Sequence, residues 1–291
     1  MNDEMSEDLV WLEPQTPEEV INELINTYKK TDFYVLYSGG KDSSSVAHFI
    51  AENYPDNFKG VVFTNTGISS PITRKFALDY TKKMGWNLTM TWAHKTYYDI
   101  VMRGGFPAPA YHRIVMGYLK SQSWRIFMDS KLQAGEKACF ISGVRKKESM
   151  VRDKIKFYTK KPIDVDGRMV FAKPFLYKNG EQLYQYFIEN GLKKSPAYEW
   201  ANKSGECWCG CFSGGVFEIK MIEKYDPFLF KTIKWLEKEL QLHGTPTAKK
   251  RPLWGLSVGT VNSEDQLDLE SFFGEKINAN EDYCGESCAV E

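Results

Sequence analysis

The segment DFYVLYSGGKDSSSVA, residues 32–47, constrains the fold of this chain more than any other. It opens with an apolar, β-rich run, turns at two glycines, and continues into spacing typical of a helix. Glycines let backbone N–H groups approach an anion, and a helix N-terminus offers unpaired donors and a favourable dipole. The segment therefore predicts a phosphate-binding loop, in which Asp42 could also hold Mg²⁺. Its candidate residues are Ser38, Gly39, Gly40, Lys41, Asp42 and Ser43.

One other interpretation of this segment competes with the phosphate site. A plain strand-to-helix connection, capped by Asp42 or Ser43, would need no ligand. The common P-loop does not fit, because that motif requires a glycine five residues before its Gly-Lys pair and Ser or Thr directly after the lysine. This chain has Val35 and Asp42 at those two positions.

Strand and helix candidates alternate along the first half of the chain. Further β-rich runs lie at 60–64, 87–92 and 138–142, and helical spacing recurs at 16–28, 72–84 and 117–132. Such alternation predicts an α/β fold: a Rossmann-like, mostly parallel sheet with helices on both faces. More helix candidates follow at 180–190 and 226–242, on either side of a cysteine group, which predicts a helical, cysteine-containing C-terminal region.

Two further polar motifs follow strand candidates, at the edge of a parallel sheet where ligands bind. The first is the turn Asn65, Thr66 and Gly67. The second is GVRKKESMVR, which begins at Gly143. If this second motif is helical, Arg145, Glu148 and Arg152 share a face, and arginine binds phosphate or sulfate bidentately. A surface charge network is the alternative. Lys120 lies on the helix candidate at 117–132, which precedes this second motif. The charge pattern there is equally compatible with a solvated helix face and with a role in binding substrate.

Five of the six cysteines form two tight groups. Cys207, Cys209 and Cys211 are the first group, and Cys284 and Cys288 are the second. This clustering predicts a metal centre held by thiolates, either an iron–sulfur cluster or zinc. Zinc sites usually have two-residue spacers, which neither group has, so the pattern favours iron–sulfur. Buried free cysteines are the alternative, and Cys139, within a strand candidate, is expected to be one of these.

Taken together, the strings SGGKDSSS, TNTG and GVRKKESMVR resemble the phosphoadenosine phosphosulfate (PAPS) reductase family of the PP-loop adenine-nucleotide α-hydrolase superfamily. The resemblance is clear over 33–155, and NGLKKSPAYEWANKSGECWCGC is similar to a later family segment. It implies a PP-loop nucleotide-binding domain, which we place at 16–175, followed by the cysteine-containing region at 176–291. It also implies ATP or PAPS as ligand. By this resemblance the loop at Ser38–Ser43 contacts phosphate, Asn65, Thr66 and Gly67 lie near the adenosine, and Gly143, Arg145 and Arg152 lie near phosphate or sulfate.

Sulfonucleotide reductases of this family resemble one another in a C-terminal Glu-Cys-Gly-Ile/Leu-His segment that carries the catalytic thiol. The nearest string here is YCGESC, in which Cys284 is followed by glycine but by no histidine. The cysteine spacing also differs from the adjacent Cys-Cys pair and distant Cys-x-x-Cys of the iron–sulfur reductases. With Asp42, Cys284 is the candidate catalytic residue.

Three functions are compatible with these residues. The resemblance implies first a sulfonucleotide reductase, an oxidoreductase whose thiolate attacks sulfur and is regenerated by a thioredoxin-like thiol donor. The second is an ATP-pyrophosphatase-type sulfurtransferase that receives sulfur from a donor and thiolates tRNA or DNA, with Lys249, Lys250 and Arg251 meeting the phosphate backbone. The third is a non-catalytic nucleotide-binding protein.

The overall composition limits the partners. Lys plus Arg and Asp plus Glu both number 38, so a zero net charge does not imply a nucleic-acid partner. Neither a run of about 18 apolar residues nor a signal-peptide pattern occurs, so we expect no membrane span and a cytoplasmic location.

Overall fold

A six-stranded sheet organises the computed structural model, which describes residues 15–28, 32–131, 138–146, 163–166, 169–213 and 215–256. The strand order is β3-β2-β1-β4-β6-β5, in which only β5 is antiparallel to its neighbour. The strands are β1 (Asp32–Leu36), β2 (Phe58–Thr64), β3 (Leu88–Thr91), β4 (Ala138–Ile141), β5 (Ile163–Asp166) and β6 (Met169–Ala172). The predicted mostly parallel, Rossmann-like sheet is therefore confirmed.

The order of the strands reverses at β1. From β1 the chain runs outward through β2 and β3, and then returns to place β4 on the other side of β1. The carboxyl ends of β1 and β4 thus diverge at a topological switch point, which is where open α/β sheets bind ligands. The glycine-rich turn and the GVR motif follow these two strands.

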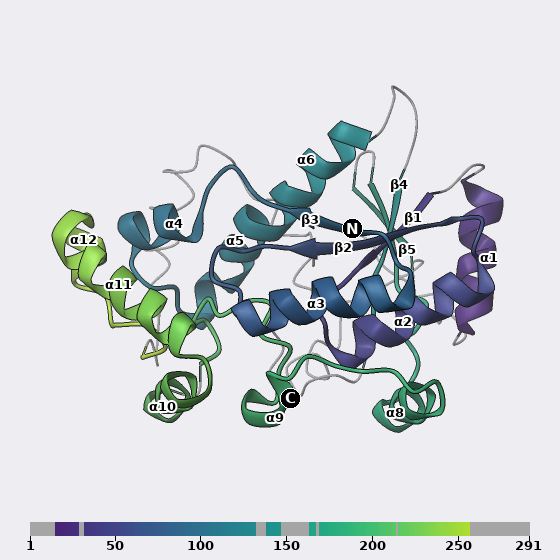
Figure 1. Cartoon of the computed structure of the whole chain (residues 1–291). Coiled ribbons are helices and arrows are strands. Elements are labelled where there is room, and N and C mark those ends of the chain that lie inside the picture. The colour runs from purple at the N-terminus through teal and green to yellow at the C-terminus, as the bar shows by residue number, and fades with distance from the viewer. Residues whose placement is uncertain are drawn as a thin grey trace, which may run out of the picture.

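Helices cover both faces of the sheet, as predicted (Figure 1). On one face α1, α2, α3 and α8 pack on the sheet through residues such as Val20, Ile50, Ala77 and Leu183. On the other face α6 covers β2, β4 and β6 with an aromatic cluster. These helices are α1 (Pro17–Thr27), α2 (Lys41–Asn53), α3 (Pro71–Met84), α6 (Gln122–Lys131) and α8 (Gly180–Glu189).

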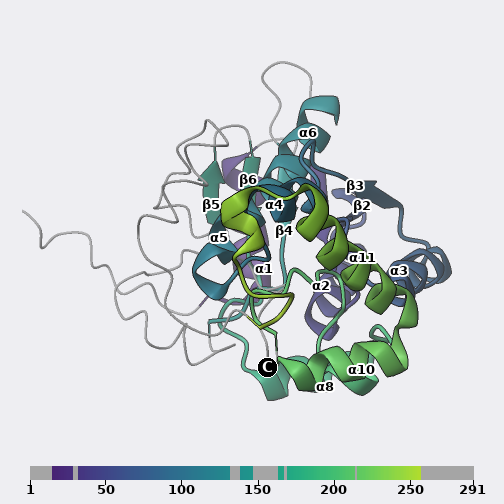
Figure 2. The same cartoon turned by 90° about the vertical axis from the view of Figure 1, so that its left-hand side faces the viewer.

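A second group of helices surrounds the cysteine loop at 207–211. It shares one apolar core with that loop, and this core includes Tyr97, Trp208, Ile222 and Trp254 (Figures 1 and 2). The predicted helical, cysteine-containing region is thus confirmed for Cys207–Cys211, whereas Cys284 and Cys288 lie outside the described residues. The elements are α4 (Tyr97–Gly104), η1 (Pro109–Tyr111), α5 (His112–Met116), α9 (Tyr198–Ala201), α10 (Val216–Tyr225), α11 (Pro227–His243) and α12 (Pro246–Lys249).

One local prediction is refined and another needs correction. The helical stretch predicted at 117–132 is present over 117–131, and its first part is a π turn, η2 (Gly117–Ser121), that leads into α6. The solvated position considered for Lys120 is wrong, because its side chain is buried. Among the described residues, no helix is long and apolar enough to span a membrane.

Candidate functional site

The glycine-rich turn leads directly into the N-terminus of α2. Gly40 occupies the N-cap position, and because it has no side chain, the cap supplies no oxygen to the N–H groups of the first turn. Gly39 adopts φ +78°, a left-handed conformation that glycine tolerates. The plain capped connection would have placed an Asp42 or Ser43 side chain at the cap. In the observed geometry no side chain caps the N-terminus of this 13-residue helix. The backbone N–H groups of its first turn can therefore donate to an anion.

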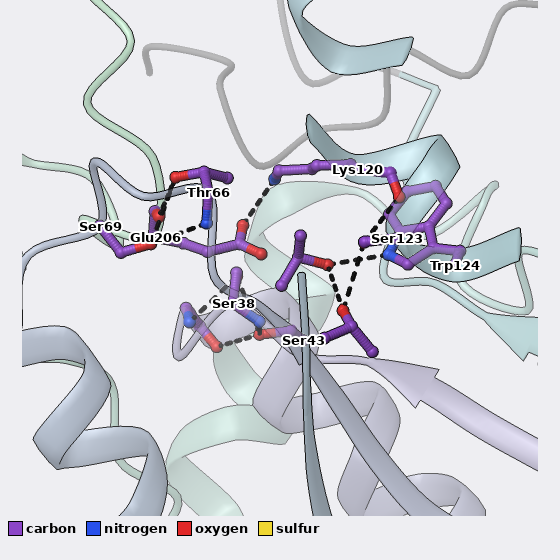
Figure 3. A network of polar contacts seen from close by, with 11 residues as sticks. Ser38, Ser43, Thr66, Ser69, Lys120, Ser123, Trp124 and Glu206 are labelled. Atoms are coloured by element: carbon purple, nitrogen blue, oxygen red, sulfur yellow. Dashed lines mark hydrogen bonds and ion pairs between the residues drawn. The ribbon is translucent and has the colours of Figure 1, made fainter. Parts of the chain in front are cut away.

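Two serines of the loop hold this turn in shape (Figure 3). The Gly40 N–H donates to Ser38 Oγ at 3.3 Å, and the Ser38 N–H donates to Ser43 Oγ at 3.2 Å. Ser43 Oγ in turn donates to the Gly40 carbonyl oxygen at 3.1 Å. The hydroxyls predicted as phosphate donors therefore brace the loop in this structure.

The GVR motif meets the loop across the switch point. An added Cβ on Gly143 would lie 2.9 Å from the backbone carbonyl of Asp42, so only glycine fits there without displacement. Arg145 Nη2 lies 3.3 Å from Asp42 Oδ2, and Lys41 Nζ lies 3.7 Å from Asp42 Oδ1. Two cations therefore flank the Asp42 carboxylate beside the N-terminus of α2. The predicted association of Arg145 with the loop is present, whereas Glu148 and Arg152 lie outside the described residues.

A segment before the cysteine loop braces the turn from the other side. The Ser195 N–H donates to the Gly39 carbonyl at 2.8 Å, and Ser195 Oγ shares a 2.8 Å hydrogen bond with Thr73 on α3. Tyr198, the first residue of α9, directs its hydroxyl at the loop, because a Cβ added to Gly40 would lie 2.7 Å from Tyr198 Oη. Reasoning from the sequence did not place Tyr198 at this site. The Ser-Pro-Ala-Tyr string was the only signal, and it does not indicate which way the ring points.

The Asn-Thr-Gly turn after β2 lies beside the cysteine loop. The Gly67 N–H donates to Asn65 Oδ1 at 3.0 Å, which closes a local turn. The buried Thr66 hydroxyl donates to the Glu206 carbonyl at 3.4 Å. The glycine-rich loop at residues 38–43, this turn and the cysteine loop therefore lie at the same edge of the sheet.

A buried ion pair lies between these loops (Figure 3). Lys120 Nζ, on η2, lies 2.7 Å from Glu206 Oε2, and the two side chains are 1% and 6% exposed. Breaks in regular helical hydrogen bonding such as this π turn often occur at functional sites. The sequence did not indicate the pair, because 86 residues separate its members.

The cysteine loop is buried in the second core. Cys207, Cys209 and Cys211 are all buried, and the Tyr97 hydroxyl donates to the Cys209 carbonyl at 2.7 Å. Burial raises the pKa of Tyr97 well above its usual range, and the three cysteines beside it raise it further. Cys139 is buried within β4, as predicted.

The donor chemistry of this loop fits a thiolate-bound metal, but the structure does not bring its three cysteines together as a metal-binding group. Within the described parts of the chain, no group of three or more cysteine, histidine or carboxylate side chains is positioned to hold a metal ion. Any metal centre at Cys207, Cys209 and Cys211 would therefore need donors from outside those parts, such as Cys284 or Cys288.

Comparison with known proteins identifies one family model, described as phosphoadenosine phosphosulfate reductase domain, which matches residues 32–213, more than half of the chain. No curated protein sequence matches the chain.

Solved structures similar to the chain include two fungal enzymes. One is the PAPS reductase of Candida auris in a phosphate complex, at 12% identity and a TM-score of 0.45, covering 64% of this chain and 84% of that one. Another is the FMN adenylyltransferase of Candida glabrata in complex with FMN and an ATP analogue, at 14% identity and a TM-score of 0.46, covering 64% of this chain and 59% of that one. At such low similarity these structures carry no argument about function.

Proposed function

Because this chain belongs to the phosphoadenosine phosphosulfate reductase domain family, we propose that it is an adenine-nucleotide enzyme of sulfur metabolism. The nucleotide is ATP or a sulfonucleotide such as PAPS. Its phosphate or sulfate groups bind at residues 38–43, with Gly143 and Arg145 as the opposite wall and Asn65, Thr66 and Gly67 nearer the adenosine. Arg152 extends the same anion site.

One observation carries this proposal. The uncapped N-terminus of α2 opens at the switch point, where the carboxyl ends of β1 and β4 diverge, and the buried Arg145 lies there against Asp42. Backbone donors, a helix dipole and a guanidinium converge on one place, and all three favour an anion. Asp42 orients the guanidinium, and with ATP it would also be available to hold Mg²⁺.

As a sulfonucleotide reductase, the protein would use Cys284 as its nucleophile. The thiolate attacks the sulfur of the sulfate group and forms an S–S bond, while the S–O bond breaks and releases adenosine 3′,5′-bisphosphate. A thiol donor then attacks the cysteine sulfur and releases sulfite. A second thiol regenerates Cys284 and leaves the donor as a disulfide. Lys41 and Arg145 would stabilise charge on the nucleotide throughout.

A second candidate, an ATP-dependent sulfurtransferase acting on tRNA or DNA, is favoured by the charge distribution. Residues 1–14 contain five acidic and no basic residues, and residues 257–291 contain nine acidic residues and one lysine. Between these ends the chain has 37 Lys and Arg against 24 Asp and Glu. The zero net charge therefore conceals a strongly basic central part, which suits a polyanionic substrate.

Two product assays separate these reactions. Sulfite release from PAPS with a thiol donor supports the reductase, whereas pyrophosphate release from ATP that depends on added tRNA or DNA supports the sulfurtransferase. Neither product with either nucleotide, from protein shown to bind nucleotide, would reject both enzyme classes in favour of a non-catalytic nucleotide-binding protein.

Tyr198→Phe is expected to weaken nucleotide binding about tenfold without loss of stability. The substitution removes only the hydroxyl that lies against Gly40, and a hydrogen bond to a charged group contributes about 1.5–3 kcal/mol. Calorimetric titration of both proteins measures the change. Tyr184→Phe on α8 is the matched control, because Tyr184 is exposed to solvent. Equal nucleotide affinity in wild type and Tyr198→Phe would show that the Tyr198 hydroxyl does not contribute to the site.

A thiolate-bound metal centre is a further part of the proposal. We expect protein purified without oxygen to contain iron and inorganic sulfide and to absorb visible light. A colourless protein with one zinc per chain would support the metal site but reject an iron–sulfur cluster. Cys209→Ser should lower the metal content, while Cys139→Ser, in the sheet core, should not. Protein that contains neither metal would reject the centre.

A further inference from the structure

The outer face of α11 carries an exposed row of large apolar side chains. Phe228, Trp235 and Leu242 are 65%, 50% and 57% exposed. They stand seven residues apart, so the helix places them in one line, with a rise of about 10.5 Å from each to the next. The opposite face of α11 packs in the second core through Ile233 and Leu236. Figures 1 and 2 show α11 at the outside of the molecule. Large apolar side chains grouped on a surface mark an interaction site.

Lysines alternate with these side chains along the helix. Lys231 and Lys238 each stand three residues after an aromatic residue of the row, so they share its face, and both are exposed. Neither lysine forms an ion pair with another described residue. At the end of the row, Lys249 from α12 donates to the Leu242 carbonyl at 3.2 Å and brings a third cation to this surface.

The acidic residues of α11 do not cancel this charge. The helix has two of them. Glu237 is buried and lies 2.7 Å from Lys234 Nζ, and the Glu239 side chain is largely covered and lies 3.7 Å from His243 Nε2. The exposed charge on the outer face is therefore mostly positive, which complements an anionic partner.

Trp235 is held in an orientation suited to stacking. The Tyr98 ring of α4 lies against the indole, with ring centroids 5.6 Å apart and planes inclined by 25°. Half of the Trp235 side chain nevertheless remains exposed. An aromatic ring that is fixed on one side and exposed elsewhere offers a base a flat surface and loses little side-chain entropy when the base stacks on it.

We propose that this face of α11, defined by Phe228, Lys231, Trp235, Lys238 and Leu242, binds single-stranded nucleic acid. Bases stack on the two aromatic rings, and the lysines contact the phosphate backbone. Surfaces that bind single strands combine these same two elements, a cationic track and exposed aromatic side chains. The inference rests on the second candidate function, the sulfurtransferase, whose tRNA or DNA substrate this face would hold.

The spacing of the row disfavours a partner helix or a second copy of this chain. Helices that pair through a heptad seam bury apolar side chains at two positions in every seven. Here only one of the two positions is apolar, and the other is Lys231 or Lys238. A partner helix would bury these ammonium groups, and a second copy would also bring lysine against lysine. A polyanion with stacking bases instead engages both kinds of side chain.

Fluorescence anisotropy with the full-length chain and a labelled single-stranded DNA oligonucleotide tests the proposal. Trp235→Ala removes a stacking surface, so the affinity should fall about tenfold while the slope of log K against log salt stays unchanged. Lys231→Gln, Lys238→Gln removes two phosphate contacts, so that slope should become shallower by roughly 1.4, or about 0.7 for each lysine. The same sequence as a duplex should bind more weakly, because its bases are already stacked on one another.

Two matched variants serve as controls. Tyr184→Ala removes a ring that is similarly exposed, at 53%, but lies on α8. Lys82→Gln, Lys83→Gln removes the same charge from exposed lysines on α3. Because charges beyond a Debye length are screened, neither control should change the affinity more than about twofold. If Trp235→Ala does not fold, Phe228→Ala makes the same test at a more exposed position of the row.

Several results would overturn the proposal. Equal oligonucleotide affinity in wild type and both α11 variants would do so, and pyrophosphate release that still depends on tRNA or DNA would then mean that the sulfurtransferase stands and holds its substrate elsewhere. Binding of no oligonucleotide would overturn both this proposal and the sulfurtransferase, and would leave the reductase to the sulfite assay. A dimer, or binding to anionic phospholipid vesicles, that is lost in Trp235→Ala from a protein that binds no oligonucleotide would assign the face to that occupant instead.

Discussion

Lys120→Met is expected to lower the free energy of unfolding by about 3–5 kcal/mol, a large part of the stability of an ordinary domain. The substitution takes from the Glu206 carboxylate, which is 6% exposed, the ammonium group that lies 2.7 Å from it. A buried charge is costly because water no longer solvates it. Urea denaturation of both proteins measures the difference.

The double variant Lys120→Met, Glu206→Leu distinguishes the lost pair from general damage. It removes both charges, so much of the stability should return, and a double-mutant cycle gives the coupling energy. Lys75→Met is the matched control, because the Lys75–Asp79 pair has a similar separation of 2.8 Å but is largely exposed. It should change stability very little. If Lys120→Met were as mild as Lys75→Met, the buried pair would not be an important contact between η2 and the cysteine loop.

Gly143→Ala is expected to weaken nucleotide binding by about ten- to a hundredfold. The new methyl group would lie 2.9 Å from the backbone carbonyl of Asp42, which cannot move without shifting the first turn of α2. Overpacking of this kind typically costs about 1–3 kcal/mol, and relieving it would displace the N–H groups that are proposed to bind phosphate.

Gly180→Ala provides the control for this second prediction. Its methyl group would meet Arg145 Nη1 at 3.5 Å, an ordinary contact, at the start of α8. Titration of the two variants with the same nucleotide should show a loss only for Gly143→Ala. Equal affinities would mean that the approach of Gly143 to Asp42 does not shape the site.

The sequence was sufficient for the features that depend on local patterns. The Gly-Gly turn, the apolar runs and the helical spacing predicted strands β1 to β4 and the helices α1 and α2. These predictions succeed because backbone preference and periodicity act over a few residues.

The features that the sequence did not reveal depend on contacts between distant residues. Lys120 pairs with Glu206 across 86 residues. A lysine on a helix usually marks a solvated face, so its burial can be known only once the partner is in place. The Tyr198 hydroxyl was missed for the same reason, because the path of the loop at 193–198 decides where it points.

The edge pair β5 and β6 was also absent from the sequence-based prediction. Its strands are only four residues long, and β5 runs antiparallel, unlike the rest of the sheet. Short strands leave little periodic signal, and their existence depends on the open edge of β4 that they cover.

Calorimetric titration with ATP and, separately, with PAPS tests the central claim most directly. Wild-type protein should bind at least one of them at one site per chain. Asp42→Ala and Ser43→Ala should each abolish or greatly weaken that binding while the unfolding transition remains cooperative. Binding of neither nucleotide to wild type, or unchanged affinity in both variants, would contradict the assignment of an adenine-nucleotide site to the loop at residues 38–43.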